Sequence, residues 1–258
     1  MTVTTPSTIT PLPSTDSRPG FGSTSRFGAA RVAGLLYLTI IVCGLFAEVG
    51  VRSRLVEQGD PTATAANILE HPTLFRAGIA ADIVMLLCDV AIAVVLYQLL
   101  RPISRTLSLV AAAFRMTQTA VLGLNLLSMF QALRVLDDAE YLDTFGPAQL
   151  DALALLSLDA HRYGYILGLM FFGVSTVVVG AIVRRSGRTP WALALLLVVA
   201  GLGYLADGAM FFMIPGYDGS ASAIVLAPAL IAELWFCGWL LTKGRSFDEL
   251  TAHESPAR

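Results

Sequence analysis

Charged side chains are scarce in this chain. Only 14% of its 258 residues are charged, whereas 55% are hydrophobic and the mean hydropathy is +0.70. Soluble domains usually contain about 25% charged residues, because a surface in contact with water needs them. The composition therefore excludes an ordinary water-soluble domain and favours a protein whose solvent is lipid.

Cysteine, histidine and positive charge are also scarce. Cys43, Cys88 and Cys237 each lie inside a long apolar run, which excludes a disulfide framework and gives no metal-ligand spacing. The three histidines are scattered, and there is no nucleophile elbow, P-loop or zincin motif. The sequence thus predicts no catalytic set, metal site or cofactor. The net charge of −2, with no basic patch, argues against nucleic-acid binding.

Long apolar runs are what the chain has in abundance. Each is 20 to 25 residues long, which suits a hydrocarbon core about 30 Å thick at ~1.5 Å rise per residue. Together they predict an all-α integral membrane bundle of six transmembrane helices. The predicted spans are 32–51, 77–100, 106–130, 163–183, 190–214 and 221–241.

The remaining segments divide the chain into a tail, a membrane domain and a second tail. Residues 1–28 are rich in Ser, Thr and Pro and predict a disordered tail, since they cannot bury enough apolar surface to offset ordering. Residues 29–245 form the six-helix domain, and 246–258 form a short C-terminal tail. Two connections, starting at Pro61 and at Pro147, predict short interfacial helices, although each could instead extend the following span into water.

The distribution of Lys and Arg predicts the orientation. Alternate connections carry eleven of these residues on one side and five on the other, with Arg115 inside a span. Positive charge stays on the cytoplasmic side, so both termini should be cytoplasmic in a bacterial plasma membrane.

Ionisable residues inside the spans are the candidates for function. A charge at the bilayer centre costs ~2.5–3.5 kcal/mol on the insertion scale, so these side chains must face protein or water. Glu48 and Asp82 lie near enough to the outer interface to reach water. The predicted spans contain five carboxylates and only one arginine, so some of the carboxylates should be protonated or should hold a cation. The candidate intramembrane polar site comprises Asp82, Asp89, Arg115, Gln118, Asn125, Asp207 and Glu233.

One pair stands out among these residues. The second and third spans are joined by a short loop and must be antiparallel neighbours. Asp89 lies eleven residues before the end of one span and Arg115 nine after the start of the other, so they sit at similar depth. The spacing predicts an Asp89–Arg115 contact, which could serve function or simply fix helix register.

Several blocks resemble a bacterial membrane family catalogued as domain of unknown function 4386. RVAGLLYLTIIVCGLFAE at 31–48, residues 64–105 and AAAFRMTQTAVLG at 111–123 carry the resemblance, and residues 161–215 carry it most specifically. The fourth span is similar to the family pattern at Tyr163-Gly164, Phe171-Phe172-Gly173 and Gly180, and the fifth at 201–207. By resemblance, Asp82, Asp89, Arg115 and Asp207 occupy family-pattern positions.

The resemblance implies an architecture and no activity. Trp191 stands where the family typically has arginine, and Ala181 where an aromatic is usual; neither departure threatens the fold. The tail and the acidic third connection lie outside the resembling blocks.

Three functions are compatible with the sequence. A small proton- or cation-linked transporter would use the intramembrane carboxylates and would have a water-accessible cavity at the midplane. A structural or accessory protein would have a dry, fully paired interior. An intramembrane enzyme is the least favoured, because no nucleophile–base set is visible. The expected partner is the lipid bilayer, with an unidentified ion or small molecule, and a homo-oligomer if the solute is large.

Overall fold

The computed structural model describes residues 28–137, 142–217 and 222–253, without the side chains of 223–226 and 250–253. In this part of the chain the regular structure is helical and contains no strand. The predicted tail at 1–28 lies almost wholly outside the described residues.

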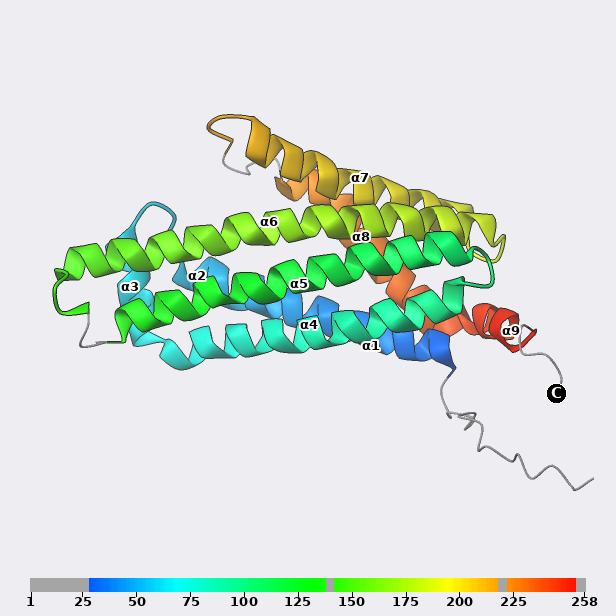
Figure 1. Cartoon of the computed structure of the whole chain (residues 1–258), viewed down its shortest axis with the longest axis horizontal. Coiled ribbons are helices and arrows are strands. Elements are labelled where there is room, and N and C mark those ends of the chain that lie inside the picture. The colour runs from blue at the N-terminus through cyan, green and yellow to red at the C-terminus, as the bar shows by residue number, and fades with distance from the viewer. Residues whose placement is uncertain (1–27, 138–141, 218–221, 254–258) are drawn as a thin grey trace, which may run out of the picture.

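Six long helices run side by side along the molecule (Figure 1). Each packs against the next in the chain, and the last also packs against the first, so the helices close a ring. The described members of the ring are α1 (Ala29–Leu45), α4 (Pro72–Leu100), α5 (Arg105–Leu136), α6 (Pro147–Arg185), α7 (Trp191–Met213) and α8 (Ser222–Lys243).

Short elements gather at the two ends of the ring. α1 runs on through a π-helical segment, η1 (Phe46–Arg52), and one turn of α2 (Ser53–Leu55). The end of the bundle that holds α3 (Pro61–Glu70) is called the α3 end. The end that holds α9 (Arg245–His253) and the start of α1 is called the α9 end (Figure 1).

The protein is an all-α integral membrane bundle. Among the described residues, five helices are long and apolar enough to cross a bilayer: α1 with its extension to Leu55, α4, α5, α6 and α7. The sixth predicted span, 221–241, coincides with α8 but begins outside the described residues. The count of six spans therefore stays a prediction.

Of the two predicted interfacial helices, one is present. Residues Pro61–Glu70 form the separate helix α3, which packs against α6; Asp60 caps it by accepting a hydrogen bond from the Ala63 amide at 2.9 Å. For the second, the alternative holds: residues from Pro147 onward extend the following span as the first turns of the 39-residue helix α6. No glycine or proline occurs between Pro147 and Gly164 to end the helix, so it continues into the span.

The segment predicted as a C-terminal tail contains α9, which packs on the bundle. Phe247 is buried, with its ring centroid 5.1 Å from that of Trp239. The Asp248 carboxylate accepts a hydrogen bond from the Ala30 amide at 3.1 Å and so caps the start of α1. The last helix thereby fixes the beginning of the first.

The apolar core is divided into two clusters. One lies toward the α9 end and includes Ile92, Leu99 and Phe236; the other lies toward the α3 end and includes Phe75 and Met129. Buried polar side chains lie between and beside them.

Candidate functional site

A cavity of about 720 Å³ lies inside the ring of helices. Its walls are mostly apolar, with side chains such as Ile40, Met85, Leu122 and Leu169 from four different helices. Polar residues line one part of it. These are Tyr37, Glu48, Asp89, Arg115, Gln118, Tyr165, Tyr204, Ser222 and Glu233.

One polar part of the cavity wall is the predicted pair, Asp89 on α4 and Arg115 on α5. Arg115 donates from Nε and Nη2 to Asp89 Oδ1, at 2.9 and 2.5 Å, and both residues are at most 4% exposed. Gln118, one turn further along α5, donates from Nε2 to Asp89 Oδ2 at 3.2 Å. The Arg115 guanidinium also lies 5.3 Å from the Tyr37 ring centroid and 5.0 Å from that of Phe172. The predicted contact is thus present and is enclosed by aromatic rings.

A further carboxylate approaches the cavity from α8. Glu233 accepts a hydrogen bond from the Tyr204 hydroxyl at 2.6 Å, which joins α7 to α8. Glu233 lies ten residues before the end of α8, and Arg115 lies ten after the start of α5. At ~1.5 Å per residue, both lie about 15 Å from the α9 end, so they share one depth in the bundle.

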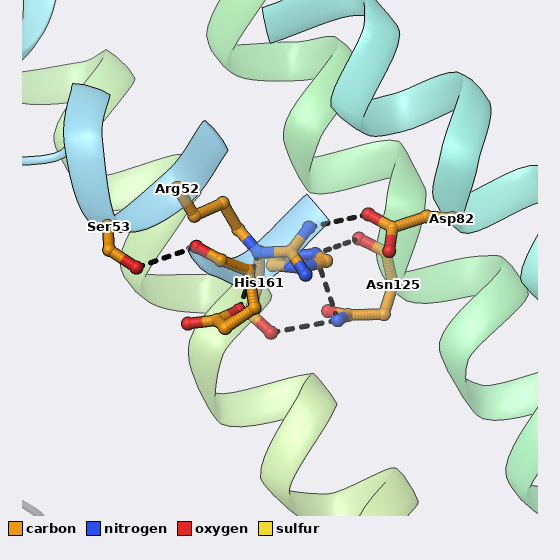
Figure 2. Close-up of polar contacts among 6 residues, drawn as sticks. Arg52, Ser53, Asp82, Asn125 and His161 are labelled. Atoms are coloured by element: carbon orange, nitrogen blue, oxygen red, sulfur yellow. Dashed lines mark hydrogen bonds and ion pairs between the residues drawn. The ribbon is translucent and has the colours of Figure 1, made fainter. Parts of the chain in front are cut away.

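A second polar layer lies toward the α3 end and centres on Arg52 (Figure 2). Its Nη1 donates to Asp82 Oδ2 at 2.5 Å and its Nε to Glu48 Oε2 at 2.8 Å. The guanidinium lies 5.7 Å from the ring centroid of Tyr165. The π-helical segment η1 carries both Glu48 and Arg52, and such segments are frequent at functional sites.

Asn125 and His161 complete this second layer. Figure 2 shows them beside Arg52, between α5 and α6. The Asn125 Nδ2 donates to the His161 carbonyl oxygen at 2.8 Å and lies 3.0 Å from His161 Nδ1. If Nδ1 accepts from Asn125, the proton of the neutral ring is on Nε2.

Several deeply buried polar atoms have no hydrogen-bond partner among the described residues. Two belong to the Arg52–Asp82 pair, one to Gln118 and one to His161, and each of these residues is at most 8% exposed. Buried polar atoms are nearly always hydrogen-bonded, to protein or to ordered water. These positions therefore call for water or for the polar atoms of a ligand. The atoms are Arg52 Nη2, Asp82 Oδ1, Gln118 Oε1 and His161 Nε2.

Comparison with known proteins identifies the family. Residues 32–244 match the family model described as Domain of unknown function (DUF4386). The chain belongs to this family. The match runs through the acidic third connection and to the end of α8, beyond the blocks that carry the resemblance in the sequence.

One relative of this DUF4386 protein comes from Archaeoglobus fulgidus. It is described as an uncharacterised protein and is 29% identical over 182 residues, which cover 70% of this chain and 91% of the relative. No solved structure matches the chain. Membership of the family therefore supports the architecture and assigns no activity.

The seven candidate residues of this DUF4386 chain fall into three places. Asp89, Arg115, Gln118 and Glu233 line the cavity, and Asp82 and Asn125 belong to the second layer. Asp207 lies apart, near the end of α7. It accepts hydrogen bonds from the Tyr217 hydroxyl at 3.0 Å and from Ser222 Oγ at 2.6 Å.

Two sequence-based expectations are wrong. Asp82 is not at the surface of the bundle, because it is 2% exposed and paired with Arg52, although the Glu48 side chain is 58% exposed. The interior also holds two arginines rather than one, since Arg52, assigned to a connection, is buried. A local signal in the sequence could have placed Arg52 in the helix: Glu48 and Arg52 are four residues apart, which is the spacing of a helical ion pair.

Proposed function

We propose that this protein is a small proton- or cation-linked transporter that binds its solute in the central cavity. The observation that carries the proposal is the cavity itself, about 720 Å³ in volume and reaching Asp89, Arg115 and Glu233. Ligand sites commonly enclose ~300–1,000 Å³ and combine apolar walls with a few polar groups. Ionisable residues inside a membrane protein most often mark a substrate or ion pathway.

The charges around the cavity favour a cation or proton over an anion. Four carboxylates and two arginines are held in or beside it, namely Glu48, Asp82, Asp89, Glu233, Arg52 and Arg115. Each arginine is bonded to at least one carboxylate, so the uncompensated charge is negative. In a region of low dielectric, that excess favours a bound proton or a positively charged solute.

The proposed transporter spans the plasma membrane six times, with both termini in the cytoplasm. α6 ends with Arg184 and Arg185, the connection to α7 carries Arg188, and α8 ends at Lys243, all at the α9 end. The excess of Lys and Arg at this end is the support for a cytoplasmic position.

A structural or accessory role has one observation in its favour. The Asp89–Arg115 pair joins α4 to α5 through several hydrogen bonds and would fix their register without any solute. A purely structural interior, however, would be dry and fully paired. The cavity and the partnerless Gln118 Oε1 favour the transporter.

Charge movement in proteoliposomes tests the proposal. Wild type would be compared with Glu233→Gln under an imposed pH gradient and then with a panel of cations. Glu233 is the better target than Asp89, because Asp89→Asn would leave Arg115 buried without its partner. Glu57→Gln, an exposed carboxylate outside the cavity, is the matched control.

We expect a current in wild type and in the control, and at least a tenfold smaller one in Glu233→Gln. Silence of the wild type across the panel, with all three proteins equally folded, would favour the structural role instead.

A further inference from the structure

The cavity has a mouth on one side of the bundle. Among the described residues that line it, the exposed ones belong to two segments only: Leu45, Glu48 and Val49 on α1–η1, and Ala227 and Leu230 on α8. α8 packs along α1, whereas η1 packs against α4. In the described part of the chain, the two segments therefore part toward the α3 end, and the cavity opens between them.

The surroundings of this mouth are mostly apolar. Leu45, Val49 and Leu230 are 45%, 58% and 43% exposed, and their exposed neighbours include Phe46 and Ile231. The one charged residue among the exposed lining residues named above is Glu48, which is paired with Arg52. Exposed apolar side chains in the middle of a membrane helix face lipid, because contiguous patches of this kind are not left in water. The mouth thus opens sideways into the bilayer rather than into the water at the end of the bundle.

The inner part of the cavity offers hydrogen-bond acceptors and negative charge. Gln118 lines the cavity and is 5% exposed; its Nε2 donates to Asp89, and its Oε1 is buried without a partner among the described residues. The Glu233 carboxylate lines the same space, and the rings of Tyr37 and Tyr204 add aromatic surface. Acceptors and aromatic faces together suit a cation.

We propose that the cavity takes a lipophilic cation, an ammonium or phosphonium centre on a bulky apolar body, which enters from the bilayer between η1 and α8. Its charge lies at Glu233, and its apolar body packs against Met85, Leu122 and Leu169. This inference rests on the cavity of the proposed transporter, but not on transport itself.

Binding of tetraphenylphosphonium to the purified full-length protein in detergent tests the ligand class, with equilibrium dialysis as the measurement. Tetraphenylborate, which has the same shape and the opposite charge, is the matched probe. We expect the phosphonium to bind at least tenfold more tightly than the borate. Glu233→Gln should weaken phosphonium binding at least tenfold, and Glu57→Gln should leave it unchanged. Equal affinity for the two probes, or no effect of Glu233→Gln, would overturn the inference.

The rate of phosphonium binding in lipid nanodiscs tests the mouth. Leu230→Trp places a bulky ring at the opening, whereas Leu234→Trp, one turn along the same helix, adds the ring to an exposed position that does not line the cavity. We expect at least a fivefold slower association for Leu230→Trp and none of that slowing for Leu234→Trp. Equal rates for both variants and wild type would overturn the lateral route.

The outcomes separate this inference from the proposed function. Phosphonium binding without flux of any cation would support the ligand class and contradict transport. Flux of protons or tetramethylammonium, without phosphonium binding, would support transport and overturn the lipophilic cation.

Discussion

At the residue scale, Arg115 shows how the bundle stabilises a charge inside a membrane. Its guanidinium makes two hydrogen bonds to Asp89 and lies against two aromatic rings. Desolvation of such a charge costs several kcal/mol, and only a partner with good geometry offsets that cost. The two residues therefore act as one unit: if either is removed, the other remains as an unpaired buried charge and destabilises the fold.

Arg115→Met tests this unit. We expect the free energy of unfolding to fall by ~3–5 kcal/mol, because Asp89 is left buried without its partner. The double variant Asp89→Leu/Arg115→Met should recover much of the loss. Reversible unfolding in mixed detergent micelles measures both. Arg76→Met is the control: it breaks an ion pair with Asp137 whose side chains are more than half exposed, and such pairs contribute ~0–1 kcal/mol. An equal effect of Arg115→Met and Arg76→Met would contradict the account.

The sequence predicts some of these residue contacts and not others. The Asp89–Arg115 pair follows from two helices joined by a short loop, because connection length fixes relative depth. Arg52 has no such constraint on its partner Asp82, thirty residues away, and it lies just beyond the apolar run. Hydropathy assigns such a residue to water, and only packing reveals that it is buried.

At the element scale, α6 and α7 approach so closely that only glycine fits between them. A Cβ at Gly201 would lie 2.5 Å from the Gly173 carbonyl oxygen, and one at Gly173 would lie 2.8 Å from the Gly201 carbonyl oxygen. Small residues of this kind allow close packing of membrane helices.

Gly201→Val should therefore force α6 and α7 apart and lower the melting temperature in detergent by at least about 10 °C. This expectation follows from a loss of several kcal/mol, since backbone rather than a flexible side chain blocks the added atoms. Gly238→Ala, on α8, is the matched control, because a Cβ there meets nothing within 4 Å. Equal melting temperatures for Gly201→Val and Gly238→Ala would contradict this account.

The C-terminal helix gives a second prediction at this scale. Asp248→Ala should weaken the cap of α1, because the Ala30 amide then loses its side-chain acceptor, at a cost of ~0.5–2 kcal/mol. Hydrogen exchange of the amides at the start of α1 should become faster by roughly tenfold, whereas Asp60→Ala should affect only α3. Unchanged exchange in α1 would show that α9 does not stabilise it.

Element boundaries were predictable only in part. Hydropathy locates the lipid-facing section of a helix, so the predicted span at 163–183 covers little more than half of α6. At ~1.5 Å per residue, 39 residues measure about 58 Å, well beyond a ~30 Å hydrocarbon core. α9 was missed because its nine residues are too few and mostly polar, and so carry no span signal.

At the scale of the whole molecule, a ring closed by α1 and α8 surrounds a cavity with two polar layers. The sequence predicts the helices and the existence of interior charges. Closure of the ring, however, depends on the packing of segments some two hundred residues apart. An example is the hydrogen bond from Cys237 Sγ to the Gly34 carbonyl oxygen, at 3.3 Å. The cavity follows from closure and so could not be predicted.

The orientation is a whole-molecule prediction as well. Reporter fusions after Arg258 and cysteine labelling in the connection between α5 and α6 should place the C-terminus in the cytoplasm and that connection outside, as the Lys and Arg distribution predicts. The reverse result would contradict the proposed orientation and would place the α3 end on the cytoplasmic side.

The central claim is that the cavity is a solute site rather than a sealed interior. Its most direct test is thiol accessibility of Ile41→Cys, a buried cavity-lining position, in a background with the three native cysteines replaced. A small membrane-permeant thiol reagent should label this cysteine in the folded protein, whereas Ile92→Cys, buried in the apolar core outside the cavity, should stay unlabelled. Protection of Ile41→Cys as complete as that of Ile92→Cys would contradict the account and indicate a sealed, structural interior.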